Sequence, residues 1–264
     1  MNRRAEWTGC SVERGEGMDI VTERVQIPIP GAGQMGGYLA RPKDGAPRPA
    51  VIVYMEIFGI NSHIRDVTER VAQEGHVALA PDYFHRTGPG VEYGYDQAGM
   101  EAGIKLLSGL TAEGMIVDAR AAITWLRQQP TVRGDRIGAM GFCIGGHMTY
   151  LTACETDVRA AASFYGGGIA APTGPGGAAS TISRTPKIRG KILCFYGGKD
   201  AHIPAPQVAA VREALRKAGT KHEVVLYDTA DHGFFCDQRA TYQREAAEDS
   251  WRRVKTLFAE ELAR

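Results

Sequence analysis

Short apolar runs alternate with amphipathic segments along most of this chain. The runs AVIVYM (50–55) and HVALAP (76–81) are short and almost wholly apolar, a pattern typical of strands buried on both faces of a sheet. Between them, Ile64, Val67 and Val71 recur at helical spacing and would share one face of a helix. Strands that alternate with helices predict an α/β fold with a mostly parallel central sheet and helices on both faces.

The same two patterns predict the other elements. Two early strands, at 25–29 and 36–41, are separated by a glycine-rich turn. Further strands are expected at 136–142, 160–166, 191–197 and 223–227. Helices are expected within 112–128, around Val208, Val211 and Leu215, and around Ala247, Trp251, Val254 and Phe258. Because ligands of such sheets bind beyond the carboxyl ends of the strands, functional residues are expected in the loops that follow them.

Length and composition favour one globular domain. The chain has 264 residues, 44% of them apolar, enough for a sizeable core, and no stretch reads as a linker. We expect a polar extension over residues 1–17, without the apolar core of a secretory signal, and a single domain over 18–264. Basic residues outnumber acidic ones by 31 to 30, and no apolar stretch has membrane-spanning length, so neither nucleic acid nor a membrane is an indicated partner.

The cysteines favour a reducing environment. Five are present, at positions 10, 143, 154, 194 and 236. They are odd in number, widely spaced and form no C-x-x-C pair, which argues against both a disulfide framework and a zinc site. We therefore expect no metal and a cytoplasmic location, where a catalytic thiol would stay reduced.

The sequence GAGQMG (31–36) matches the glycine pattern of dinucleotide-binding loops in an unsuitable context. Such a loop needs a strand before it and a helix after it. The following GYLARPKDGAPRP is rich in proline and cannot form that helix, and the preceding IPIP is a poor central strand. We interpret the motif as a hairpin turn and expect no cofactor. An NAD-dependent oxidoreductase stays as an alternative that failure to bind NAD would remove.

The sequence GFCIGG (141–146) has the form of a nucleophile elbow, G-x-S-x-G, with Cys143 in place of serine. In that motif a strand, a sharp turn and a helix project the nucleophile above the sheet, and small glycines such as Gly141 and Gly145 let the backbone turn tightly. A cysteine needs activation to the thiolate, usually by a histidine oriented by a carboxylate. Elbow geometry also assigns the backbone N–H of Ile144 to an oxyanion hole.

Two later loops supply these partners in the order acid, then base, that the fold type uses. Asp200 and His232 each follow a predicted strand. Taken singly, the aspartate could cap a helix, the histidine could lie on the surface and Cys143 could be a structural residue. Together, their order and placement predict a Cys143–His232–Asp200 triad. His147 and His202 are expected to be packing or surface residues.

Several segments resemble the dienelactone hydrolase family (carboxymethylenebutenolidases) of α/β-hydrolases. In family order they are MEIFGIN (55–61), PDYFHR (81–86), GFCIGG (141–146), FYGG with Asp200, and HGFF (232–235). The pairing of an elbow cysteine with E-I-F-G is specific, since most α/β-hydrolases have neither. The resemblance implies an α/β-hydrolase fold and a small, anionic lactone or ester as substrate.

The resemblance also implies roles for individual residues. Glu56 would lie near the resting thiol and accept its proton when substrate binds, and the backbone N–H of Ile57 would complete the oxyanion hole. Arg86 would hold a substrate carboxylate through its planar guanidinium, with a surface arginine as the alternative. Tyr83 and Tyr165 are candidates for the pocket wall, although each could as readily be a core aromatic.

One position departs from the family pattern. Members that act on dienelactone often carry a second arginine four residues after the catalytic histidine; here Cys236 occupies that position, and the nearest arginine is Arg239. Weaker carboxylate binding or a different substrate would follow. The glycine-rich segment 166–180 is expected to be a flexible loop near the site, either a lid or a connection.

These observations predict a hydrolase that opens a lactone or ester by thiolate attack and forms a thioester, which water then releases. A general carboxylesterase or thioesterase with another acyl substrate is one alternative. A catalytically silent binding protein of the same fold is a second. The chain is expected to be a monomer or a small homo-oligomer.

Overall fold

The predicted strands pair into one eight-stranded sheet in a computed structural model that describes residues 18–263. The strands are β1 (Ile20–Ile29), β2 (Gly33–Pro42), β3 (Arg48–Tyr54), β4 (Val77–Pro81), β5 (Val132–Phe142), β6 (Ala160–Phe164), β7 (Lys191–Gly197) and β8 (His222–Tyr227), in the spatial order β1-β2-β4-β3-β5-β6-β7-β8. From β4 onward in that order every neighbouring pair is parallel. The mostly parallel sheet is confirmed, and the predicted extension at 1–17 lies outside the described residues.

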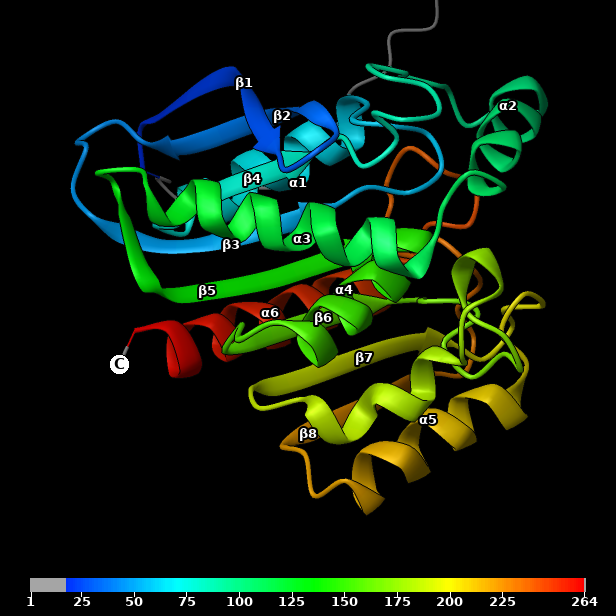
Figure 1. The fold of residues 1–264 in the computed structure, drawn as a ribbon. Coiled ribbons are helices and arrows are strands. Elements are labelled where there is room, and N and C mark those ends of the chain that lie inside the picture. Colours follow the sequence, from blue (N-terminus) through cyan, green and yellow to red (C-terminus); the bar gives the residue numbers. More distant parts are fainter. Residues whose placement is uncertain (1–17, 264) are drawn as a thin grey trace, which may run out of the picture.

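Helices cover both faces of this sheet, as predicted (Figure 1). They are α1 (Ser62–Gln73), α2 (Gln97–Leu107), α3 (Ala112–Arg127), α4 (Ile144–Glu155), α5 (Ala205–Lys217) and α6 (Arg244–Leu262). In Figure 1, α3, α4 and α5 lie in front of the sheet, and α1 and α6 lie behind it. The helix α2 stands apart, at the edge where the parallel strands end.

Local capping fixes where the first helices begin. The Asn61 side chain accepts a hydrogen bond from the backbone N–H of Ile64 at the start of α1, and Thr111 does the same for Gly114 at the start of α3. Both side chains satisfy donors that have no partner within the helix. Since Asn61 directly follows the residues after β3, this cap also sets where the loop carrying Glu56 ends.

The segment GAGQMG forms the turn of an antiparallel hairpin. Gly31 and Gly33 have positive φ values of 73° and 80°, and β1 pairs with β2 across them. A strand rather than a helix follows the turn, so the turn does not lead into the helix that a dinucleotide-binding loop requires. The interpretation as a hairpin turn is confirmed.

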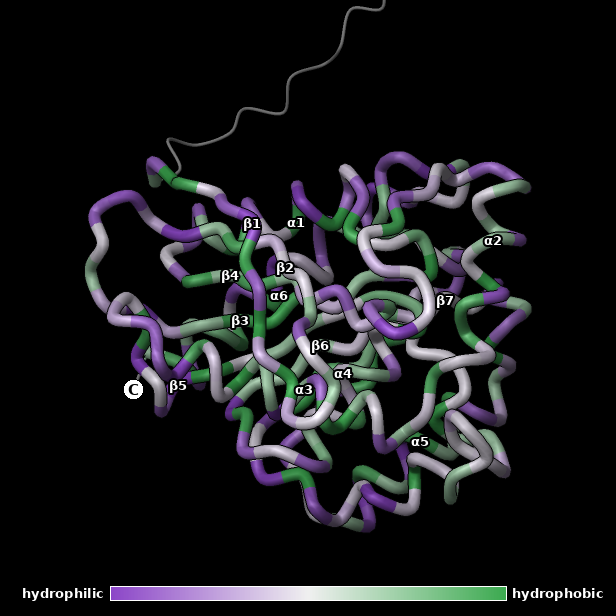
Figure 2. Tube along the Cα trace, turned by 45° about the horizontal axis from the view of Figure 1, so that its top comes forward, coloured by the Kyte–Doolittle hydropathy of each residue, from purple (hydrophilic) through white to green (hydrophobic). Residues whose placement is uncertain are grey.

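The core lies along the central strands and around α4. Residues Ala50–Tyr54 of β3 and all five residues of β6 are buried, and α4 is buried continuously from Gly145 to Cys154. Figure 2 shows hydrophobic residues gathered along these inner elements and hydrophilic residues along the outer loops. Within residues 18–263, no helix combines the length and the apolar character needed to cross a bilayer.

Acidification is expected to destabilise the protein through His76, which precedes β4. Burial and, next, the charge of Arg48 lower the pKa of His76 from 6.5 to about 4. Between these values the unfolded chain binds a proton that the native chain does not, so stability is complete above pH 6.5 and declines toward pH 4. This difference corresponds to roughly 3 kcal/mol of unfolding free energy.

Urea unfolding at pH 7 and near pH 4.5 measures this effect. The variant His76→Gln should lose less stability on acidification than the wild type. Some loss should persist, because burial also lowers the pKa values of His63 and His147. Equal losses in variant and wild type would show that His76 is not responsible.

Candidate active site

Cys143 occupies a strained turn between β5 and α4. Its φ of 57° and ψ of −120° place a residue other than glycine in a left-handed conformation, which is the geometry of a nucleophile elbow. The backbone N–H of Cys143 donates to the carbonyl oxygen of Phe164 on the neighbouring strand, at 3.1 Å. Cys143 is partly exposed, whereas Cys154, Cys194 and Cys236 are buried.

The glycines of the elbow are required by close backbone contacts. A Cβ atom at Gly141 would lie 2.4 Å from the carbonyl oxygen of Gly145, and one at Gly145 would lie 2.3 Å from that of Met55. A Cβ atom at Gly146 would lie 2.4 Å from the carbonyl oxygen of Phe164. The turn therefore packs directly against the residues that follow β3 and β6, and the tight-turn role predicted for these glycines is confirmed.

Asp200 and His232 lie beside the elbow, at the ends of β7 and β8. The His232 Nδ1 is 2.7 Å from Asp200 Oδ2, and the other Asp200 oxygen accepts a hydrogen bond from the backbone N–H of His202 at 2.8 Å. The side chain of Cys143 is close enough to His232 to raise the pKa of the imidazole. The structure thus brings together the three residues that the sequence places after separate strands.

The charges of the three groups favour a protonated imidazole. Burial alone would lower the pKa of His232, but the charge of Cys143 and the hydrogen bond to Asp200 outweigh it and raise the pKa to about 10. Burial would raise the pKa of Asp200, whereas its hydrogen bond and its charge interaction with His232 lower it overall. An imidazolium held between a carboxylate and a sulfur is the arrangement that nucleophilic cysteines use.

Glu56 is buried at the end of β3, which neighbours β5 in the sheet. Its side chain is 1% exposed, and its Oε1 accepts a hydrogen bond from Arg239 Nη1 at 2.8 Å. Its second oxygen, Oε2, has no hydrogen-bond partner among the described residues. Glu56 is therefore not a loop residue that faces solvent.

Arg239 lies beside Glu56 and His232, although the family pattern places its second arginine at the position of Cys236. Its guanidinium packs over the rings of Phe58 and Tyr95, with Cζ 5.8 and 5.6 Å from the ring centroids. A Cβ atom at Gly233, next to His232, would lie 2.6 Å from that Cζ. The residue in the family position, Cys236, is fully buried instead. An arginine three residues later in the chain therefore brings a cation beside the catalytic loop.

Two of the predicted substrate-binding residues already have partners in the protein. The two terminal nitrogens of Arg86 donate to Asp118 on α3 at 2.7 and 2.8 Å. The Tyr83 hydroxyl donates to the carbonyl oxygen of Met55 at 2.7 Å, and its side chain is 1% exposed. The structure therefore makes Tyr83 a core aromatic that supports the loop before Glu56. Arg86 pairs with Asp118, whereas Glu56 pairs with Arg239. The role of Arg86 in substrate binding stays a prediction.

Tyr165 does reach the triad. It follows β6 with a φ of 36°, and its ring stands edge-on to His232 with centroids 5.0 Å apart. The side chain is fully buried, and its hydroxyl has no hydrogen-bond partner within the described part of the chain. Tyr165 therefore packs behind the imidazole and helps to fix its plane.

The residues assigned to the oxyanion hole lie on adjacent strand ends. Ile144 is the first residue of α4, directly after Cys143, and Ile57 follows Glu56 beyond β3. Gly103 of α2 packs on Ile57, since a Cβ atom there would lie 2.4 Å from the Ile57 carbonyl oxygen. The helix α2 thus holds this loop in place, although no periodic signal in the sequence had indicated it.

The loop 166–180 is tied down on the same side of the site. His147 on α4 bonds through Nδ1 to the carbonyl oxygen of Gly167 and through Nε2 to Thr181 Oγ1, both at 2.8 Å. Within the loop, the backbone N–H of Gly174 donates to the carbonyl oxygen of Ala178. His147 is therefore a buried packing residue, as expected, and it anchors a loop that the sequence suggested to be flexible.

His63 is a further buried polar residue that the sequence did not single out. It is 0% exposed, neither ring nitrogen has a hydrogen-bond partner among residues 18–263, and its ring stands edge-on to Phe142 and Phe235. Across the same residues, no group of three or more His, Cys, Asp or Glu side chains is placed to hold a metal ion.

The sheet order, the elbow after β5 and the acid and histidine after later strands define an α/β-hydrolase. Residues 35–262 match the model of the dienelactone hydrolase family. The chain belongs to this family, and it is therefore a hydrolase of ester or lactone bonds. The family resemblance and the fold class inferred from the sequence are confirmed.

Individual relatives agree with this assignment. The chain is 46% identical to the "Putative carboxymethylenebutenolidase" of Synechocystis sp. over 93% of its own length and 99% of the relative's. It is 28% identical to the carboxymethylenebutenolidase of Pseudomonas putida, covering 86% of this chain and 92% of that one. The crystal structure named "Putative Dienelactone Hydrolase" from Klebsiella pneumoniae superposes with a TM-score of 0.83 at 34% identity, covering 92% and 99%.

Proposed function

We propose that this protein hydrolyses a small lactone or ester through a Cys143–His232–Asp200 triad and a thioester intermediate. The observation that carries the proposal is the position of His232. Its Nδ1 is 2.7 Å from Asp200 Oδ2, and its pKa is raised by the nearby side chain of Cys143, which itself sits on a strained elbow. Nucleophile, base and orienting acid are thus connected in the order that the reaction requires.

In the proposed first step, the Cys143 sulfur attacks the carbonyl carbon of the substrate. The backbone N–H groups of Ile57 and Ile144 donate to the oxygen that becomes negative. Collapse of this intermediate breaks the ester bond, and the proton on His232 passes to the leaving alkoxide; in a lactone, that alkoxide stays attached to the acyl group. His232, held by Asp200, then takes a proton from water, which attacks the thioester and releases the acid.

Glu56 is proposed to exchange between two partners during this cycle. In the structure it is neutralised by Arg239, whose guanidinium also lies within electrostatic range of Cys143. A substrate carboxylate that binds Arg239 would compete for this pairing and free Glu56 to accept the proton of the Cys143 thiol, which Glu56 returns to the sulfur when the thioester is cleaved. Arg239 thereby becomes the candidate anchor for an anionic substrate. It would replace the second arginine of the family, whose position is occupied here by Cys236.

The substrate class follows from this anchor and from the relatives. Two of the relatives compared above are carboxymethylenebutenolidases by name, and an arginine beside the nucleophile suits a lactone that carries a carboxylate. We propose a dienelactone-type substrate that opens to a dicarboxylic acid. A general carboxylesterase is the second candidate, favoured by the ion pair that occupies Arg86.

The proposal is tested by following the loss of dienelactone absorbance at neutral pH, beside a panel of neutral esters and thioesters. Fast turnover of dienelactone with weak activity on neutral esters would support it. Turnover of neutral esters alone would support the general esterase. Silence across the panel, with Cys143 unreactive to alkylating agents, would indicate a binding protein of the same fold.

The variant Arg239→Gln is expected to lose both substrate affinity and stability. It should raise KM for the anionic lactone about tenfold, because a charged hydrogen-bond donor is removed. It should also lower the free energy of unfolding by about 3 kcal/mol, because Glu56 is left buried without its partner. Steady-state kinetics and urea unfolding measure the two effects.

A double variant separates these effects. In Glu56→Gln/Arg239→Gln no unpaired buried charge remains, so most of the lost stability should return while KM stays high. Arg216→Gln, on an exposed ion pair of α5, is the matched control and should leave both quantities unchanged. An unchanged KM in Arg239→Gln would rule out Arg239 as the anchor.

A further inference from the structure

A cavity lies on the opposite edge of the sheet from the elbow. It has a volume of about 310 Å³ and is formed by the start of β3, the residues before β4, the end of α1 and the last turns of α6. The elbow, Asp200 and His232 follow the carboxyl ends of the strands, whereas this cavity is at their amino ends. It is therefore separate from the proposed active site, and its size is at the lower end of the range of small-molecule sites.

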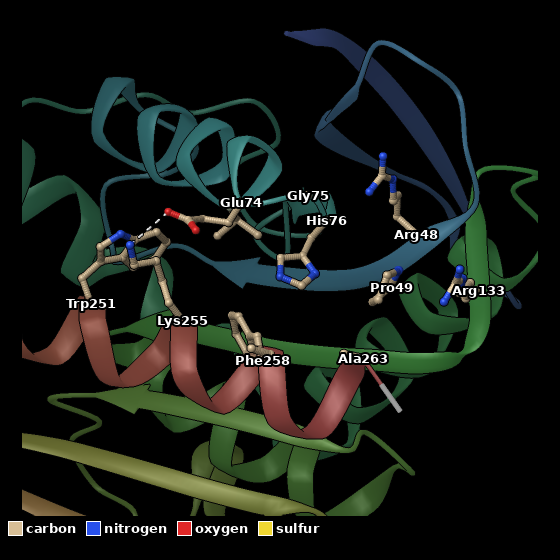
Figure 3. A pocket seen from close by; sticks show the side chains of 12 residues that line it. Arg48, Pro49, Glu74, Gly75, His76, Arg133, Trp251, Lys255, Phe258 and Ala263 are labelled. Atoms are coloured by element: carbon tan, nitrogen blue, oxygen red, sulfur yellow. Dashed lines mark ion pairs between the residues drawn. The ribbon is translucent and has the colours of Figure 1, made fainter. Parts of the chain in front are cut away.

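Cationic side chains gather at one end of this cavity (Figure 3). Arg48 and Arg133 both lie there, near Pro49. Arg48 uses Nη2 to bond Asp44 at 2.7 Å, but its Nε is buried and has no partner among the described residues. Arg133 is exposed, and its side chain forms no ion pair with another residue of 18–263.

His76 adds a second buried polar group in the middle of the cavity, and its Nδ1 can donate in one neutral tautomer. Its ring stands edge-on to Phe258, with centroids 5.7 Å apart, and faces the arginine end in Figure 3. Its Nδ1 is buried and has no hydrogen-bond partner in the described part of the chain. Buried donors without partners are rare in folded proteins, because each costs the free energy of a lost hydrogen bond. One oxyanion near Arg48 could accept from both groups.

The rest of the cavity is lined by apolar side chains, with an exposed ion pair at its far end. Phe258 and Trp251 of α6 form its wall, with Val71 of α1. At the far end Glu74 pairs with Lys255 at 3.3 Å. The Glu74 carboxylate disfavours a second negative group there, so the charge pattern fits a ligand with one anionic end and an apolar body.

We propose that this cavity binds a small organic monocarboxylate, with its carboxylate at Arg48, Arg133 and His76 and its apolar body along Phe258 and Trp251. The site is an accessory one, because no residue of the proposed triad lines it. The inference does not depend on the proposed activity. The proposed binding site is at the amino ends of the strands, whereas the proposed catalytic residues follow their carboxyl ends.

Calorimetric titration of the whole protein with benzoate tests this site. We expect binding with a Kd of about 1 mM or lower. The variants Arg48→Gln and Arg133→Gln should each weaken it about tenfold, because each removes a charged donor to the carboxylate. Arg216→Gln, with the same charge change on α5, should bind benzoate as the wild type does. In ¹⁵N spectra, a histidine ring signal that is missing in His76→Gln should move with benzoate.

Three outcomes would overturn the proposal. The first is the absence of benzoate binding to a wild-type protein that is folded. The second is binding that survives in Arg48→Gln and Arg133→Gln but is lost in Arg239→Gln, since the ligand would then occupy the proposed active site. The third is equal affinity for acetate and benzoate, which would show that the apolar wall contributes nothing. None of these results depends on whether the triad is active.

Discussion

Replacement of Cys143 with alanine is expected to lower kcat/KM for the preferred ester or lactone by at least about 10⁴-fold, with little change in stability. The sulfur is the atom that forms the acyl bond in the proposed cycle, so the variant can retain only the contributions of substrate binding and the oxyanion hole. The Cys143→Ser variant tests the same step with a different nucleophile. Its hydroxyl is a much weaker acid than a thiol, and His232 must therefore remove a proton that the cysteine gives up more readily.

Steady-state kinetics with purified variants measure the loss, and mass spectrometry of the quenched wild type should detect an acyl group on Cys143. The control is Cys154→Ala, which changes a buried cysteine of α4 outside the site. It should keep near-wild-type kinetics and lose only the stability of a small cavity. Full activity in Cys143→Ala would mean that another group is the nucleophile, and the proposed mechanism would then fail.

Replacement of Gly145 with alanine is expected to cost about 4 kcal/mol of unfolding free energy or to prevent folding. The added Cβ would lie 2.3 Å from the carbonyl oxygen of Met55 and 2.5 Å from that of Tyr54. Both obstacles are backbone atoms at the end of a central strand, so they cannot move aside as a flexible side chain could. Relief would require α4 to separate from β3, which would also displace Cys143.

The matched control is Gly36→Ala in β2, where an added Cβ meets nothing within 4 Å. That variant should stay within about 0.5 kcal/mol of the wild type. Urea unfolding followed by circular dichroism compares the two variants. If Gly145→Ala were as stable as Gly36→Ala, the close packing of the elbow against β3 would be wrong.

The sequence was most informative where structure is set by neighbours along the chain. Apolar periodicity placed the strands and most helices, and the absence of a helix after GAGQMG identified the hairpin. The order of Cys143, Asp200 and His232 could be read because parallel strands end at one edge of a sheet. Each of these inferences uses only local pattern and the general geometry of a fold class.

The partners of charged side chains could not be read in this way. The pair between Glu56 and Arg239 joins residues 183 positions apart, and Arg86 finds Asp118 across 32 positions. Such pairs depend on the path of individual loops, which no periodic pattern encodes. Counting positions from the histidine therefore drew attention to Cys236, whereas the guanidinium that packs against Gly233 belongs to Arg239.

The distance along the chain between the site residues has a consequence for synthesis. Glu56 and the elbow emerge from the ribosome long before His232 and Arg239, because translation proceeds from the N-terminus. Until β8 and its loop have joined the sheet, the buried glutamate lacks its cation and, in the proposed mechanism, the thiol lacks its base. Under that mechanism a nascent chain carries an inactive cysteine, and reactivity arises only when the last strand is in place.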